Sequence, residues 1–138
     1  AGPLRVAVAG ASGRMGRMLI EAICGAGDCV LSGALDLADS PSIGQDATAF
    51  LGRTSGVHIG ADLRIALSAA QVLIDFTRPE GTLAHLAMCR ELGVKAVVEL
   101  TQLVALENMR SRFNSAAGLQ SQGYSDVCEL PLAVPSNA

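Results

Sequence analysis

Short hydrophobic runs, each closed by a glycine or polar turn, recur along most of the chain. The first run, residues 4–9, is nearly unbroken and leads into a glycine-rich turn. After the turn, apolar residues recur three or four positions apart. They are Met15, Leu19, Ala22 and Ile23. This pattern predicts a buried strand, a tight turn and an amphipathic helix that ends near Gly25 and Gly27.

The same alternation continues downstream of this first unit. Residues 39–56 are rich in breakers and predict a loop, with a short apolar turn around residues 47–51. Further strands are predicted at residues 29–35, 57–59, 72–77, 94–98 and 128–134, with helices at 62–69, 83–92 and 104–117, and a loop at 118–126. Strands that alternate with helices predict the α/β class and a doubly wound parallel sheet, a Rossmann-type dinucleotide-binding domain.

Composition agrees with this architecture and excludes other classes of protein. The 138 residues are 50% hydrophobic but only 3% aromatic, so aliphatic side chains fill the core, as suits buried parallel strands. A net charge of −3 without a basic tract argues against a nucleic-acid partner. No apolar run approaches the roughly 20 residues that span a bilayer, so no membrane partner is expected. Nothing near the N-terminus resembles a signal peptide, and we expect a cytoplasmic protein.

The cysteines indicate neither a disulfide nor a metal site. Cys24, Cys29, Cys89 and Cys128 show no C-x-x-C spacing, and no histidine accompanies them at metal-site intervals. We expect four reduced and mostly buried thiols that pack as small hydrophobes.

The glycine turn at residues 10–16 carries the candidate chemistry. Gly10 permits a tight exit from the strand, Gly13 lets backbone N–H groups approach a phosphate, and Gly16 lets the helix pack closely. Ser12 stands where the commonest fingerprint has its second glycine. The helix N-terminus adds partial positive charge for a pyrophosphate. The candidate cofactor-binding residues of this turn are Gly10, Ala11, Ser12, Gly13, Arg14, Met15 and Gly16.

An acidic residue follows the second strand at the interval that a dinucleotide fold requires. Asp36 lies 20 residues after Gly16, where a carboxylate accepts hydrogen bonds from the adenosine ribose. An ordinary turn aspartate is the alternative interpretation. Leu37 provides no positive charge for a 2′-phosphate, so the sequence favours NADH over NADPH.

A second candidate group follows the strand at residues 72–77. Ligands lie beyond the carboxyl ends of parallel strands, so Thr77 and Arg78 should face the cleft. The alternatives are a solvated loop charge for Arg78 and a carboxylate satisfied by nearby backbone for Asp75. We expect His58 and His85 to be surface residues.

Two segments make the chain resemble a known family. The turn with Arg14, Met15 and Gly16, and the sequence from Ile74 to Leu83, resemble the N-terminal domain of dihydrodipicolinate reductases, as does the helix through Met88, Cys89 and Arg90. The resemblance is strong over residues 1–98 and weak over 99–138. It implies that the turn holds the pyrophosphate, Asp36 the ribose, Thr77 the nicotinamide end, and Arg78 the same cleft. After Val98 only Thr101 matches the family's Gly-Thr-Thr-Gly cofactor turn.

The resemblance implies an oxidoreductase of lysine and diaminopimelate biosynthesis. Such enzymes use NAD(P)H to reduce 4-hydroxy-tetrahydrodipicolinate to tetrahydrodipicolinate, and they are homo-oligomers. We expect residues 1–138 to be the cofactor-binding domain, without the substrate domain whose His-His pair and Lys bind the cyclic dicarboxylate. No residue of the chain is therefore assigned a catalytic role. The alternative is a non-catalytic dinucleotide-binding module that senses redox state or docks on a partner. An His-His-x-x-x-Lys segment encoded downstream of Ala138 would favour the enzyme.

Overall fold

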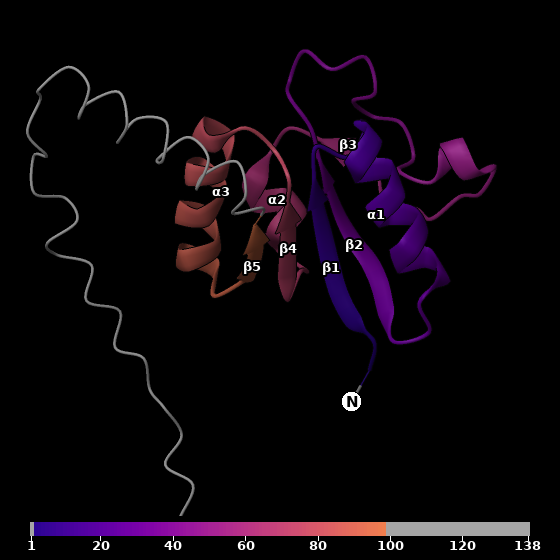
Figure 1. Cartoon of the computed structure of the whole chain (residues 1–138), viewed down its shortest axis with the longest axis horizontal. Helices are drawn as coiled ribbons and strands as arrows, with labels where there is room; N and C mark the ends of the chain where they lie inside the picture. Colours follow the sequence, from indigo (N-terminus) through magenta and orange to yellow (C-terminus); the bar gives the residue numbers. More distant parts are fainter. Residues whose placement is uncertain (1, 99–138) are drawn as a thin grey trace, which may run out of the picture. The chain divides into compact units, whose positions relative to one another are not determined.

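The computed structural model describes residues 2–98, and these form a five-stranded sheet with helices on both faces (Figure 1). All paired strands are parallel, and their order is β3-β2-β1-β4-β5. The first strand lies at the centre, and the chain builds outward from it in both directions. The doubly wound parallel sheet predicted from the sequence is therefore confirmed.

The elements agree with the predicted order and differ at some of their ends. They are β1 (Leu4–Ala9), α1 (Arg14–Gly25), β2 (Cys29–Leu35), the 3₁₀ helix η1 (Ala49–Leu51), β3 (Ile59–Gly60), α2 (Leu63–Leu67), β4 (Val72–Asp75), α3 (Pro79–Leu92) and β5 (Lys95–Val98). The prediction that the third helix begins near Leu83 is wrong. It begins at Pro79, because a proline at the first helical position needs no N–H partner and has the right φ.

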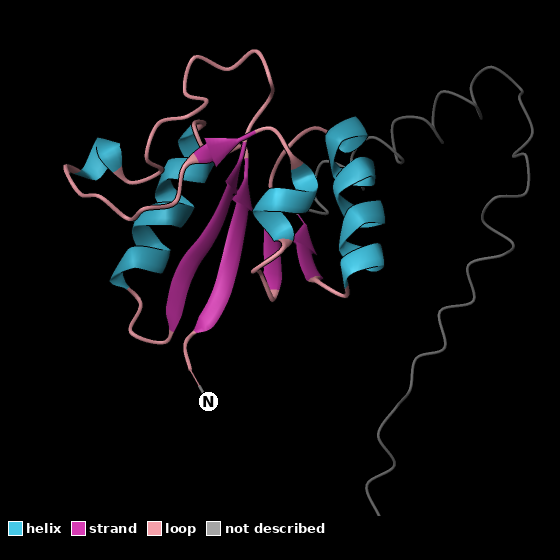
Figure 2. Ribbon diagram, turned by 180° about the vertical axis from the view of Figure 1, so that it is seen from behind, coloured by secondary structure: helices cyan, strands magenta, loops and turns pink. Residues whose placement is uncertain are grey.

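Strand β1 is buried on both faces of the sheet. Val6 and Val8 belong to a core cluster with Ile20 and Ile23 of α1. The intervening residues Ala7 and Ala9 belong to a second cluster that includes Leu67 of α2 and Cys89 of α3. Helix α1 thus covers one face and α2 and α3 the other, as Figure 2 shows from behind. The nearly continuous apolar run of β1 follows from this double burial.

The buried face of α1 agrees only in part with the apolar spacing. Ile23 is buried and Leu19 packs against the core as predicted, whereas Met15 is 45% exposed and Gly16 and Ile20 are buried in addition. The difference arises because the glycine at position 16 makes the closest approach to the sheet. That approach turns the helix so that Met15 points away from the core.

A bulge in β2 lets the second face pack closely. Val6 pairs with Leu31 but the next residue, Ala7, pairs with Gly33, so Ser32 is left out of the ladder. A Cβ on Gly33 would overlap the carbonyl oxygen of Ala66. Helix α2 therefore rests directly on the backbone of β2.

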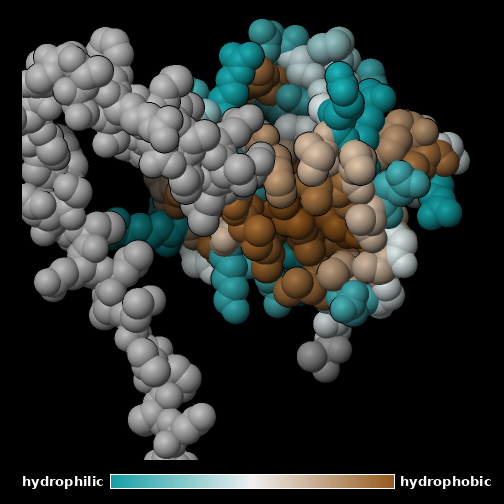
Figure 3. Space-filling model, viewed as in Figure 1, coloured by the Kyte–Doolittle hydropathy of each residue, from teal (hydrophilic) through white to brown (hydrophobic). Residues whose placement is uncertain are grey.

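Part of the sheet on the α1 side carries apolar surface. Val97 of β5 is 53% exposed, and its register partner Ile74 in β4 is only partly buried. Figure 3 shows apolar side chains gathered on the face that Figure 1 presents. Among residues 2–98, no helix has the length and hydrophobicity needed to cross a membrane.

The expectation of mostly buried thiols is only partly right. Cys24 is exposed, Cys29 is half-buried and Cys89 is buried, and all three are free. Cys128 and Thr101 lie outside the described residues, as do the elements predicted at 104–117, 118–126 and 128–134.

Candidate functional site

Three neighbouring strands bring the predicted site residues to one edge of the sheet. The glycine turn follows β1, Asp36 follows β2, and Thr77 lies just after β4. Because β1 lies between β2 and β4, Asp36 and Thr77 flank the turn on opposite sides. This edge holds the carboxyl ends of the strands, where parallel α/β sheets bind their ligands.

The glycine turn leaves β1 sharply and opens α1. Gly10 has φ +68°, a conformation that side chains other than that of glycine rarely permit. The N–H of Gly13 donates to the Gly10 carbonyl at 3.0 Å and closes the turn. Gly13 is the N-cap of α1, and no side chain caps the helix there. The first-turn N–H groups therefore remain for an anion.

Two glycines keep the space around this turn open. A Cβ on Gly16 would overlap the carbonyl oxygen of Gly10 and lie 2.8 Å from the Cα of Ala11. A Cβ on Gly13 would lie 3.2 Å from the same Gly10 oxygen. The residues present thus fit a backbone cradle for a phosphate group, which larger side chains would fill. Arg14 and Met15, in the first turn of α1, are both exposed.

The Asp36 carboxylate ties the end of β2 to the glycine turn. Its Oδ2 accepts a hydrogen bond from the Ser12 N–H at 2.9 Å, and its Oδ1 accepts one from the Leu37 N–H at 2.9 Å. The bond from the Leu37 N–H is the one expected of an ordinary turn aspartate. The bond from the Ser12 N–H places the carboxylate against the phosphate cradle. Each oxygen keeps a further lone pair with which to accept from a ribose hydroxyl. Leu37 itself is 73% exposed.

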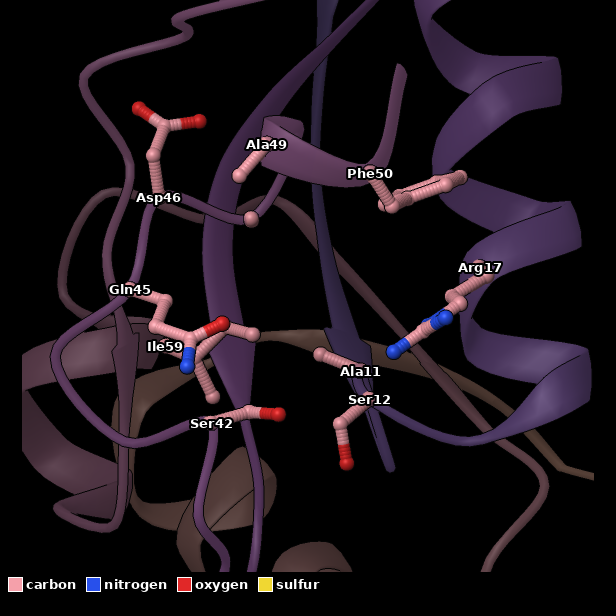
Figure 4. A pocket seen from close by; sticks show the side chains of 10 residues that line it. Ala11, Ser12, Arg17, Ser42, Gln45, Asp46, Ala49, Phe50 and Ile59 are labelled. Atoms are coloured by element: carbon pink, nitrogen blue, oxygen red, sulfur yellow. The ribbon is translucent and has the colours of Figure 1, made fainter. Parts of the chain in front are cut away.

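A shallow pocket borders Ser12 on the side of α1. It lies between this helix and the loop at residues 40–50 (Figure 4). Figure 4 shows Arg17 and Phe50 on one side and Ser42 and Gln45 on the other. The Arg17 guanidinium lies 5.6 Å from the centre of the Phe50 ring, within the range of a cation–π contact. Sequence reasoning missed Arg17 and Phe50, because no local pattern links the helix to that loop.

Asp46 holds this loop in place. Its carboxylate accepts from the N–H and hydroxyl of Thr48, the N–H and hydroxyl of Ser55 and the N–H of Gly56. The hydrogen bonds from Thr48, followed by those from Ser55 and Gly56, outweigh desolvation and lower the pKa of Asp46. The pocket wall therefore rests on an ionised aspartate.

The end of β4 carries a buried cluster of polar side chains. Asp75 is 1% exposed, and its Oδ1 accepts from the Thr77 N–H at 2.8 Å and the Thr77 hydroxyl at 2.6 Å. Its Oδ2 lies 2.7 Å from Nδ1 of His85. Burial raises the pKa of Asp75, but hydrogen bonds from His85 and Thr77 outweigh it and bring the pKa to about 2. Asp75 is therefore an anion at neutral pH.

This cluster corrects the prediction that His85 is a surface residue. Its side chain is only 17% exposed, because Asp75 draws the ring toward β4 from helix α3. The signal available in the sequence was the ten-residue interval from the strand end to the first turns of the next helix. The nearby backbone does supply one bond to Asp75, but two side chains supply the others.

The remaining candidates make no hydrogen bond to this cluster, although Arg78 directly follows Thr77 in the chain. His58 is exposed, as predicted, and forms an isolated backbone bridge with Asp46. Arg78 is exposed at the N-cap of α3, and Lys95 is exposed at the start of β5, away from the carboxyl edge. Within residues 2–98, no cluster of His, Cys, Asp and Glu side chains could hold a metal ion.

The sheet order, the glycine turn and the acid that follows β2 define an α/β domain of the Rossmann type. Residues 4–117 match the family described as dihydrodipicolinate reductase, N-terminus. The chain belongs to this family.

Several relatives share one name, 4-hydroxy-tetrahydrodipicolinate reductase. The proteins of Herminiimonas arsenicoxydans and Cupriavidus taiwanensis are 61% and 60% identical over 98 residues, which are 71% of this chain and 37% of each relative. That of Burkholderia lata is 50% identical over 115 residues, which are 83% of this chain and 43% of the relative. The chain thus spans about two fifths of the length of these relatives.

Proposed function

We propose that this chain binds a nicotinamide dinucleotide at the carboxyl edge of β1, β2 and β4. The observation that carries the proposal is the hydrogen bond between the Asp36 carboxylate and the Ser12 N–H. It joins a ribose acceptor to a phosphate cradle, so the two parts of the site stand at one fixed spacing. Membership of the reductase family supports the same ligand.

Each part of the ligand has a counterpart at this edge. The turn from Gly10 to Gly16 takes the pyrophosphate on backbone N–H groups, and Asp36 takes the adenosine ribose. Thr77, on the opposite side of the turn, then faces the nicotinamide end, with Arg78 beside it. Thr101, which the sequence marks as a further cofactor-binding candidate, lies outside the described residues.

NADH is the cofactor that the local chemistry favours. The Asp36 carboxylate would repel a 2′-phosphate, and the exposed side chain of Leu37 offers no compensating charge. NADPH would need a cation brought to this position from elsewhere.

The full activity that we infer is NAD(P)H-dependent reduction of 4-hydroxy-tetrahydrodipicolinate to tetrahydrodipicolinate. The bound dinucleotide supplies hydride, and this chain positions it. A cyclic dicarboxylate needs cationic or N–H partners and a proton donor, and residues 2–98 bring no such set together. His85 is hydrogen-bonded to Asp75, and His58 and Lys95 belong to other parts of the domain. From the resemblance to the reductase family we infer that a second domain binds the substrate and that the enzyme is a homo-oligomer of the cytoplasm.

Calorimetric titration with NADH, NADPH and ADP-ribose tests this proposal. We expect NADH and ADP-ribose to bind, and Asp36→Ala to weaken both by about tenfold, since hydrogen bonds to a charged group are lost. Asp39→Ala is the matched control, because Asp39 is an exposed aspartate of the same loop. Absence of binding to any of the three ligands by the parent chain would refute the proposal. Equal losses in both variants would refute the role of Asp36.

A further inference from the structure

Asp75 is a buried anion whose hydrogen-bond partners come from the segment just after β4 and from α3. Thr77 and His85 together occupy both of its oxygens. A buried carboxylate stabilises a fold poorly compared with an apolar residue, because its desolvation offsets the hydrogen bonds it gains. The cluster therefore suggests a role beyond packing. Because it lies at the end of β4, that role belongs to the carboxyl edge where the ligand is proposed to bind.

The hydrogen bond to Asp75 determines what the Thr77 hydroxyl can do. An ionised carboxylate only accepts, so the hydroxyl proton of Thr77 points to Oδ1 of Asp75 at 2.6 Å. Nδ1 of His85 donates to Oδ2 for the same reason and prevents the carboxylate from turning. With its proton committed in this way, Oγ1 of Thr77 can only accept further hydrogen bonds. The Thr82 hydroxyl, 3.5 Å away, is one donor to it, and a second lone pair is left for a ligand.

The space next to Thr77 is kept open by glycine. A Cβ on Gly81 would lie 3.2 Å from Oγ1 of Thr77 and 3.8 Å from Cε1 of His85. On the other side, Cγ2 of Thr77 lies 3.2 Å from the place that a Cβ on Gly10 would take. Thr77 therefore borders the first glycine of the phosphate cradle, opposite Asp36.

We propose that Asp75 and His85 are positioning residues that make Thr77 a hydrogen-bond acceptor for the carboxamide N–H of the nicotinamide. This inference rests on the proposed binding of a nicotinamide dinucleotide. It adds a selectivity to that function: an amide is accepted, whereas the carboxylate of nicotinic acid adenine dinucleotide is disfavoured. A carboxylate cannot donate to Thr77, and it would meet the negative charge of Asp75.

The test compares three ligands on the full chain by calorimetry: NAD⁺, nicotinic acid adenine dinucleotide and ADP-ribose. We expect the parent to bind NAD⁺ about tenfold more tightly than the nicotinic acid analogue. This is the scale expected when one ligand gains a hydrogen bond and the other leaves the acceptor unpaired. Thr77→Val should abolish this preference and leave the affinity for ADP-ribose unchanged, while Thr77→Ser should retain the preference. A further variant, His85→Phe, removes the donor to Oδ2 of Asp75. His58→Phe is its control, because His58 is an exposed histidine elsewhere in the domain.

Asp75→Asn gives the sharpest outcome. The amide oxygen takes the place of Oδ1 and still accepts from the N–H and hydroxyl of Thr77, but the negative charge is gone, so binding of the nicotinic acid analogue should improve relative to NAD⁺. His85→Phe should weaken the amide preference without changing ADP-ribose affinity. A parent that binds ADP-ribose but shows no amide preference would overturn this inference and leave dinucleotide binding intact. A folded Thr77→Val chain that keeps the preference would also overturn it, and a parent that binds none of the ligands would overturn both proposals.

Discussion

Gly16 packs against the backbone of Gly10 so closely that a Cβ on Gly16 would overlap the Gly10 carbonyl oxygen. The first turn of α1 therefore rests on the turn that leaves β1, and the spacing of two glycines fixes the entry of the helix. This contact places the helix N-terminus at the phosphate cradle. It also determines which face of α1 is buried.

Gly16→Ala should destabilise the domain by at least about 2 kcal/mol, because the methyl group forces the helix away from the sheet. Urea unfolding followed by circular dichroism measures the change. Gly25→Ala is the control, since it lies in the last turn of the same helix with open space around it. That control should be neutral or slightly stabilising. A Gly16→Ala chain as stable as the parent would contradict the packing argument.

Gly13→Val should abolish tight NADH binding while the domain stays folded. The side chain would crowd the Gly10 carbonyl and distort the turn whose N–H groups are proposed to receive the phosphate. We expect at least a tenfold loss of affinity by calorimetry, roughly the 1.4 kcal/mol that such a factor represents. Gly27→Val, at an exposed glycine with open space around it, should bind as the parent does. Unchanged binding by Gly13→Val would exclude the turn as the phosphate site.

Leu37→Arg should improve NADPH binding by roughly 1–2 kcal/mol, the scale of one partly exposed charge-assisted contact. The exposed position of Leu37 next to Asp36 lets a guanidinium reach the 2′-phosphate. Titration of the parent and of Leu37→Arg with NADH and NADPH checks this, with Leu37→Gln as the uncharged control. If the parent already binds NADPH ten times more tightly than NADH, the proposed preference is wrong.

The stability of the domain should depend on Asp75 between about pH 4 and pH 2. Its pKa is lowered in the folded state to about 2 from 3.8, so the stabilisation is complete above the higher value. It is lost as the pH falls through the folded pKa, where the carboxylate gains a proton. The urea midpoint should therefore decrease more between pH 6 and pH 3 for the parent than for Asp75→Asn. Parallel curves would show that the hydrogen bonds from His85 and Thr77 do not favour the anion.

Residues 1–138 alone should bind cofactor without reductase turnover. Among residues 2–98, the guanidinium groups of Arg14 and Arg78 are not suited to proton donation, and His58 and His85 lie in different parts of the domain. The assay follows NAD(P)H oxidation by absorbance, with substrate made in situ by the preceding synthase. A rate near the enzyme median of about 10 per second would reveal a catalytic set within this chain.

Local pattern was enough to predict the main elements of the domain. The apolar run before Gly10 and the helical spacing after it are short-range features, and they specify a strand, a turn and a helix without distant contacts. Asp36 could likewise be placed at the edge of the site, because the order of a parallel sheet brings its carboxyl strand ends together.

Contacts between distant segments could only be found in the tertiary structure. The buried face of α1 depends on where Gly16 touches the turn, and the bulge at Ser32 depends on pairing between β1 and β2. Pairing of Asp75 with His85 joins a strand end to a helix, and the ten-residue interval between them shows a contact only once α3 is packed beside β4. The sequence by itself determined the class of fold and the edge at which a ligand binds, because periodicity and turn chemistry act locally. Only the tertiary structure decided that His85 lies inside, because its ring is covered where α3 brings it to the Asp75 carboxylate at the end of β4.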